Sequence, residues 1–135
     1  MDLGLKDKVA IITGGSDGIG KAAAISMITE GTKVAIVGRT QSKLDLAVAE
    51  IKKLTNGNVI GISADVSVEA DVQSMVNKVI SEFGQIDILV NNGTSSATTL
   101  ELMTDDDLKV DFGIKIYGAI SVSYTHLTLP TNREV

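Results

Sequence analysis

The sequence predicts an α/β domain built on a parallel sheet with helices covering both of its faces. Short runs rich in β-branched residues alternate with helical patterns, the connections between them are short, and most of the expected strands are apolar throughout. Continuous apolar runs are typical of parallel strands that are buried on both faces. Strands and helices that alternate in this way form right-handed βαβ units, and hence one parallel sheet.

Four strands and four helices are expected along the chain. The strands are expected at 8–13, 33–37, 58–63 and 86–90. The helices are expected over about 18–30, 44–54 and 68–83, and from about Thr104 onward. The first helix should end at Gly31 and the second at Asn56-Gly57, because these residues are common helix stop signals.

The order of the elements indicates a Rossmann-type doubly wound sheet, truncated after the fourth strand and the helix that follows it. In such a sheet the first strand lies between the second and the fourth, and the third lies outside the second. A flavodoxin-like fold has the same alternation of strands and helices, so motifs are needed to decide between the two.

The composition of the chain excludes several kinds of partner and of functional site. The chain has 135 residues, enough for one domain, and a formal net charge of −5, so neither nucleic acid nor a membrane is expected as a partner. It has no cysteine and one histidine, His126, which excludes disulfides and most metal sites. With no apolar run of membrane-spanning length and a charged amino terminus, a cytoplasmic location is expected.

A glycine-rich segment, Thr13-Gly14-Gly15-Ser16-Asp17-Gly18-Ile19-Gly20, lies between the first expected strand and the first helix. Glycines allow a tight turn and let backbone N–H groups approach a pyrophosphate, and the helix amino terminus adds a favourable dipole. No Lys-Ser/Thr pair follows, which excludes a nucleoside-triphosphate loop. The segment predicts a dinucleotide-binding loop, with a simple turn as the alternative.

The spacing Thr13-Gly14-x-x-x-Gly18-x-Gly20 resembles the motif of the short-chain dehydrogenase/reductase family. Three further segments match in order over roughly residues 3–121: Leu5-Lys6-Asp7-Lys8-Val9, Asp65-Val66 and Asn91-Asn92-Gly93. Gly93 and Thr94 stand where the family has Ala and Gly. The resemblance, which extends to 3-oxoacyl-acyl-carrier-protein reductase-like members, implies a nicotinamide cofactor and interconversion of a carbonyl and an alcohol. The cofactor-binding residues that it implies, with the glycine loop, are Gly14, Ser16, Asp17, Gly18, Ile19, Gly20, Arg39, Thr40, Asp65, Val66, Asn91, Asn92 and Gly93.

The end of the second expected strand favours NADP(H) over NAD(H). An NAD-binding domain places an acid there to hold the ribose 2′-hydroxyl, whereas this chain reads Val37-Gly38-Arg39-Thr40. Arg39 is suited to pair with a 2′-phosphate, and the family resemblance implies the same. The alternative is that Arg39 is a solvated charge at a helix start. Asp17 points the other way, because NADP-preferring members of the family often have a basic residue there.

The catalytic residues that the resemblance implies are not found in these 135 residues. The family uses a Tyr-x-x-x-Lys pair with a serine, and here Tyr117 is followed by Ser121 and Tyr124 by Thr128. No catalytic residue is therefore assigned, and the chain is expected to be inactive. The family also has a supporting asparagine three residues before a glycine, and counting back from Gly118 places Lys115 at that position. Either Lys115 changes the proton relay, or the alignment is shifted and Lys115 lies on the surface of a helix.

Residues 1–121 are expected to form the dinucleotide-binding half of a family domain, and residues 122–135 to be a non-native tail. The tail departs abruptly from the family and resembles translated sequencing adapter; an unusual native carboxyl terminus is the alternative.

The leading hypothesis is a fragment of an NADP-dependent oxidoreductase whose intact parent is a homo-oligomer acting on a small carbonyl or alcohol. A dinucleotide-binding module without catalysis and a non-functional gene fragment are the alternatives. The substrate is left open, since a 3-oxoacyl reductase and a sugar reductase both fit.

Overall fold

The structure, a computed structural model, describes residues 1–93 of the chain. The helix expected from about Thr104, the position of Lys115 and the segment 122–135 lie outside the described residues. Strands and helices alternate along the described part, in the order β1 (Val9–Thr13), α1 (Gly18–Thr29), β2 (Lys33–Gly38), α2 (Gln41–Thr55), β3 (Val59–Ser63), α3 (Glu69–Phe83) and β4 (Ile88–Val90).

The four strands form one parallel sheet in the order β3-β2-β1-β4. This confirms the Rossmann-type order expected from the sequence. A flavodoxin-like sheet would place the third strand beside the first, whereas β1 here pairs with β2 and β4. The register joins Thr13 to Val37 and Ile12 to Val90, so the carboxyl ends of β1, β2 and β4 meet at one edge.

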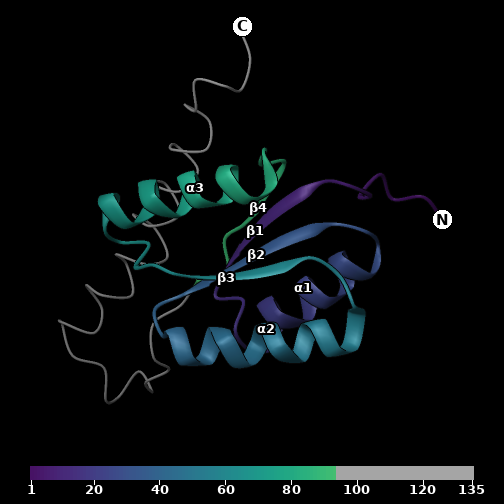
Figure 1. Cartoon of the computed structure of the whole chain (residues 1–135), viewed down its shortest axis with the longest axis horizontal. Helices are drawn as coiled ribbons and strands as arrows, with labels where there is room; N and C mark the ends of the chain where they lie inside the picture. Colours follow the sequence, from purple (N-terminus) through teal and green to yellow (C-terminus); the bar gives the residue numbers. More distant parts are fainter. Residues whose placement is uncertain (94–135) are drawn as a thin grey trace, which may run out of the picture.

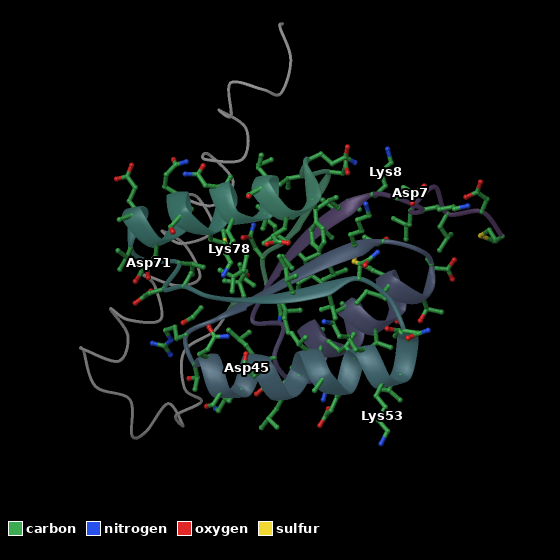
Figure 2. The ribbon with its side chains drawn as sticks, viewed as in Figure 1. Asp7, Lys8, Asp45, Lys53, Asp71 and Lys78 are labelled. Carbon is green, nitrogen blue, oxygen red and sulfur yellow. The ribbon has the colours of Figure 1, made fainter. Side chains whose placement is uncertain are left out.

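Helices cover both faces of the sheet: α1 and α2 lie on one face and α3 on the other (Figure 1). Successive side chains of a strand point to opposite faces, and β1 divides its residues accordingly. Ala10 and Ile12 pack with α1 and α2, while Val9 and Ile11 pack with α3. All four are fully buried or nearly so. Charged side chains such as Lys8 and Lys53 point away from the sheet (Figure 2).

The expected helix ends are confirmed at two positions. Asn56, which caps the carboxyl end of α2, has φ 56° and ψ 23° in the left-handed region, and its N–H donates to the carbonyl of Lys52. Gly31 follows α1 with φ +92°. Backbone of this kind favours Gly and Asn, which is why these residue types mark the ends of helices in the sequence.

The fourth strand begins at Ile88, two residues later than the sequence predicted, and Asp87 supplies the physical reason. Its carboxylate accepts a 2.9 Å hydrogen bond from the N–H of Val9, and its own N–H donates to the carbonyl of Val9 at 2.8 Å. A side chain therefore takes the place of a backbone acceptor where the β1–β4 pairing starts. The apolar run alone gave no sign of this substitution.

Within residues 1–93, none of the helices is both long enough and apolar enough to span a lipid bilayer.

Candidate functional site

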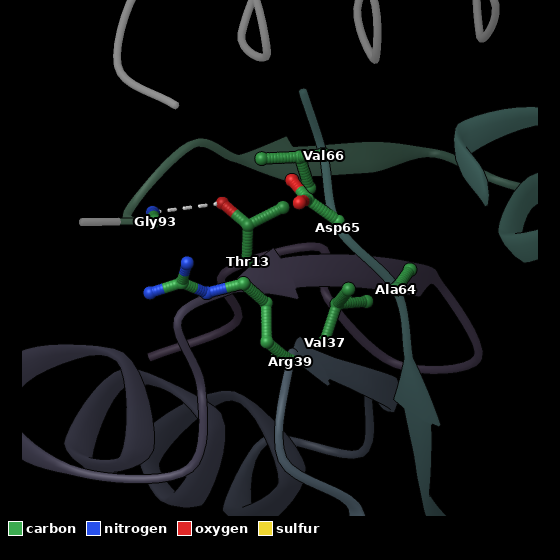
Figure 3. Close-up of a pocket in the computed structure, with 8 residues that line it drawn as sticks. Thr13, Val37, Arg39, Ala64, Asp65, Val66 and Gly93 are labelled. Atoms are coloured by element: carbon green, nitrogen blue, oxygen red, sulfur yellow. Dashed lines mark hydrogen bonds between the residues drawn. The ribbon is translucent and has the colours of Figure 1, made fainter. Parts of the chain in front are cut away.

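A pocket lies at the carboxyl edge of the sheet, where parallel α/β sheets bind their ligands. It receives residues from the ends of β1, β2 and β3 and from the segment after β4. The lining residues are Thr13, Val37, Gly38, Arg39, Ala64, Asp65, Val66 and Gly93. In Figure 3, Thr13 lies between the Arg39 and Asp65 side chains, which come from the ends of two neighbouring strands.

The glycine loop packs closely against the segment that follows β4. Gly14 has φ +67°, its N–H donates to the carbonyl of Val37 at 2.8 Å, and a Cβ on it would lie 2.5 Å from the carbonyl oxygen of Asn92. A Cβ on Gly20 would lie 2.3 Å from the carbonyl oxygen of Gly14. Real Cβ atoms do not come this close to backbone, so both positions require glycine. The loop is therefore held tightly at its two ends.

Between those ends, the amino terminus of α1 is open. Gly18 has φ +55°, and within residues 1–93 no neighbouring heavy atom lies within 4 Å of the place a Cβ would take. Asp17 is the N-cap, but its side chain makes no capping hydrogen bond, and the first turn of α1 holds no acidic residue. Ile19 beside it is 81% exposed. Backbone N–H groups at such a helix end are suited to an anion.

Thr13 joins the glycine loop to the end of β4 through its hydroxyl group. Thr13 Oγ1 accepts hydrogen bonds from the N–H groups of Asn92 at 2.9 Å and Gly93 at 3.0 Å, and it donates to the carbonyl of Val90 at 3.4 Å. The bond to Gly93 is drawn in Figure 3. Thr13 is 3% exposed, so its hydroxyl makes its hydrogen bonds inside the protein.

Asp65 lies two residues after the end of β3, in a turn that is held by side-chain hydrogen bonds. Its Oδ1 accepts from the Ser67 hydroxyl at 2.6 Å and from the Ser67 N–H at 2.9 Å, while its own N–H donates to Asp71 Oδ2 at 2.9 Å. Figure 2 labels Asp71 at the start of α3. The Ser67 hydroxyl, above all, lowers the pKa of Asp65, with the Ser67 N–H and the Arg39 charge acting in the same direction against desolvation. Asp65 is therefore a carboxylate at neutral pH.

Arg39 extends from the end of β2 into the pocket (Figure 3). Its carbonyl accepts a 3.2 Å hydrogen bond from the Ser63 hydroxyl, which links it to the end of β3. Ser16 of the glycine loop lies close by, with Oγ 3.8 Å from the place where Gly38 would have a Cβ. Thr40 follows Arg39 as the exposed N-cap of α2, without a side-chain capping bond. No acidic residue stands at the end of this strand.

The structure brings four of the residues expected from the sequence together around one pocket: Arg39, Asp65, Val66 and Gly93. Gly14, Gly20 and Asn92 form the close contact beside it, and Ser16 approaches Gly38. The remaining ones line the loop, the two helix starts or the end of β4 without entering the pocket lining: Asp17, Gly18, Ile19, Thr40 and Asn91.

Sequence reasoning missed the pocket residues Val37, Gly38 and Ala64, and it did not assign Thr13 to the site. Thr13 carried a signal, because it opens the glycine motif at the end of a strand. The other three are small or apolar residues, Val37 and Gly38 within β2 and Ala64 directly after β3, and they carried no sequence signal. Among residues 1–93 no cluster of acidic, His or Cys side chains is arranged to hold a metal ion.

Comparison with known proteins identifies relatives of this fold and site. The sequence profile described as short chain dehydrogenase matches residues 8–133. The oxidoreductase YvrD of Bacillus subtilis (strain 168) is 39% identical over 124 residues, covering 91% of this chain and 46% of YvrD. The chain thus spans about half the length of such curated relatives.

Two solved structures show the same architecture with dinucleotides bound. L-sorbose reductase from Gluconobacter frateurii, complexed with NADPH and L-sorbose, superposes with a TM-score of 0.83 at 34% identity, covering 94% of this chain and 49% of the reductase. An NAD⁺-bound xylitol dehydrogenase gives a TM-score of 0.82 at 27% identity, covering 90% of this chain and 47% of the dehydrogenase. Both nicotinamide dinucleotides therefore occur among structures similar to this one.

Proposed function

Because the chain belongs to the short-chain dehydrogenase family, we propose that it holds NADP(H) at the carboxyl edge of its sheet, as the cofactor-binding part of an oxidoreductase that interconverts a carbonyl and an alcohol. The observation that carries the proposal is the meeting of four strand ends around one pocket, beside an open helix amino terminus. When bound, the nicotinamide would supply or accept the hydride. The residues of this chain are assigned only the binding and the orientation of that cofactor.

Two features of the described residues support dinucleotide binding: the open helix end and the pocket at the strand ends. The pyrophosphate would lie at the amino end of α1, where the position of Gly18 is open and the first-turn N–H groups have no acceptor within the helix. The adenosine part would lie in the pocket between Arg39 and Asp65. The cofactor-binding residues expected from the sequence are proposed on this basis, with Thr13, Val37, Gly38 and Ala64 added as pocket lining.

Arg39 supports a preference for NADP(H). A 2′-phosphate placed at the end of β2 would meet a guanidinium, whose fork of donors matches phosphate oxygens, and no carboxylate on that strand end would repel it. Asp17 is the opposing charge. It is exposed at the N-cap of α1 and lowers the attraction of the loop for anions.

The carbonyl and alcohol chemistry is proposed for a protein of full family length, since the chain spans about half of YvrD. The 135 residues contain no Tyr-x-x-x-Lys pair, so we propose that this chain binds the cofactor without turnover. The small-molecule substrate, the cytoplasmic location and the homo-oligomeric assembly remain predictions. A role as a dinucleotide-binding module, with no chemistry at all, shares the same site.

Equilibrium titration with NADPH tests the proposal. The reduced nicotinamide fluoresces, so its emission reports transfer from water into a protein site. We expect saturable binding to the 135-residue chain and a marked weakening in Gly18→Asp, which places a carboxylate at the open amino end of α1. Lys53→Gln is the matched control, because it also makes the net charge more negative by one unit and Lys53 points away from the sheet (Figure 2). Absence of saturable binding to a folded chain would overturn the proposal.

A further inference from the structure

Lys21 and Glu50 form an ion pair between α1 and α2, the two helices that cover one face of the sheet (Figure 1). Lys21 is in the first turn of α1, and Glu50 is in the third turn of α2. The Lys21 side chain is 26% exposed and that of Glu50 is 58% exposed, so the contact is reached by solvent. Neither residue lines the pocket at the strand ends.

Lys21 lies three residues after Gly18, in the first turn behind the open helix end. Its N–H donates to the carbonyl of Asp17 at 3.2 Å, so it closes the first turn of α1 directly on the N-cap. Helical side chains lean toward the amino end of their helix. A Lys21 side chain without its partner would therefore extend toward Gly18, where the pyrophosphate is proposed to lie.

The charge of Lys21 has opposite effects on the helix and on an anion. A cation in the first turn opposes the helix dipole, and the Glu50 carboxylate offsets that cost by drawing the ammonium group toward α2. A phosphate at the same helix end would attract the ammonium group. The two anions, Glu50 and the pyrophosphate, thus compete for one lysine.

We infer that Glu50 restrains Lys21 and thereby limits the affinity of the site for dinucleotides, an inference that rests on the proposed function. Glu50 is a positioning residue, since it acts only through Lys21. The lysine would contact the pyrophosphate, which NADH and NADPH share, and not the 2′-phosphate. Releasing it should therefore strengthen the binding of both dinucleotides by the same factor.

Four variants, each compared with the wild type, test this by fluorescence titration with NADPH and NADH. Glu50→Gln should bind both dinucleotides about two- to fivefold more tightly, the scale of one surface charge contact. Lys21→Gln should bind close to the wild type, and Lys21→Gln/Glu50→Gln should match Lys21→Gln. Glu82→Gln is the matched control: it removes the same charge from α3 near Phe83, beside the amino ends of β2 and β3, and should change nothing.

Ionic strength separates this role from a structural one. The gain in Glu50→Gln should shrink as NaCl rises from about 0.05 to about 0.5 M, because the lysine and the phosphates are solvent-exposed charges. A gain caused by altered packing would not respond to salt. Thermal unfolding of each variant checks its fold, and Glu50→Ala provides a second protein that lacks the same carboxylate.

Three results would overturn the inference while leaving the proposed function intact: unchanged or weaker binding in Glu50→Gln, a gain that persists without Lys21, or a gain confined to NADPH. If the folded wild type binds neither dinucleotide, the proposed function fails and the inference fails with it.

Discussion

The side-chain amide of Asn92 donates a 3.1 Å hydrogen bond to the carbonyl oxygen of Gly14, joining residues that are 78 positions apart. The bond connects the segment after β4 to the first glycine of the loop. The same amide lies 2.6 Å from the place where Gly20 would have a Cβ, so the contact also requires a glycine at the start of α1. The shape of the loop thus depends on a residue from the other end of the described chain.

Gly20→Ala should lower the free energy of unfolding by at least about 2 kcal/mol, because the new methyl group would overlap the Gly14 carbonyl and the Asn92 amide. Gly18→Ala has free space and should cost only the left-handed backbone strain, about 1 kcal/mol. Gly38→Ala, with its nearest neighbour at 3.5 Å, is the control and should change stability by less than about 0.5 kcal/mol. Chemical denaturation measures all three; equal stability of Gly20→Ala and Gly38→Ala would refute the close contact.

Thr13→Val should destabilise the protein by about 1–3 kcal/mol, because two partly buried N–H groups, those of Asn92 and Gly93, lose their acceptor while the side-chain volume is kept. Thr32→Val is the matched control. Thr32 is equally buried, and its hydroxyl donates a 3.1 Å hydrogen bond to the carbonyl of Leu5 but accepts none from a backbone N–H among residues 1–93. A loss of stability no greater than that of Thr32→Val would show that the Thr13 hydroxyl does not organise the end of β4.

Stability should depend on pH through Asp65. Its pKa in the folded protein lies below the ordinary value of 3.8, chiefly because of the Ser67 hydroxyl. The stabilisation it provides is therefore fully present above the unfolded pKa and is lost as pH falls through the folded pKa. Ser67→Ala should reduce the loss of stability between about pH 5 and about pH 2.5. Ser74→Ala, on the exposed side of α3, should keep the wild-type slope; identical slopes in both variants would contradict the assignment.

Purified 135-residue protein should not oxidise NADPH in the presence of a reactive diketone. No tyrosine in the sequence has a lysine four residues later, so we expect these 135 residues not to assemble the proton relay proposed for a protein of full family length. Loss of absorbance of the reduced nicotinamide measures the rate, with a no-protein blank as control. Turnover clearly above the blank would show that other residues perform the proton transfer.

Much of the fold was predictable because it follows from local patterns. Apolar runs gave the strands, helical spacing gave α3, and right-handed βαβ connections then left one sheet order for a Rossmann-type domain. Arg39 and Asp65 could be placed at one edge for the same reason, since each lies within two residues of the end of a strand and parallel strands end together.

Contacts between distant polar side chains could not be predicted. The Thr13 hydroxyl accepts from residues 79 and 80 positions away, and the Lys21–Glu50 pair spans 29 positions. Neither leaves a periodic trace in the sequence. The late start of β4 has the same origin, because only tertiary structure brings the Asp87 carboxylate to the N–H of Val9.

Parallel titrations of the wild type with NADPH and NADH, at one ionic strength, test the central claim most directly. An Arg–phosphate pair predicts that NADPH binds roughly ten- to a hundredfold more tightly, and that Arg39→Asp reverses the preference. Lys53→Asp, the same charge reversal on the outer side of α2, should keep the wild-type preference (Figure 2). If the wild type binds NADH as tightly as NADPH, Arg39 does not select the 2′-phosphate and the claim is wrong.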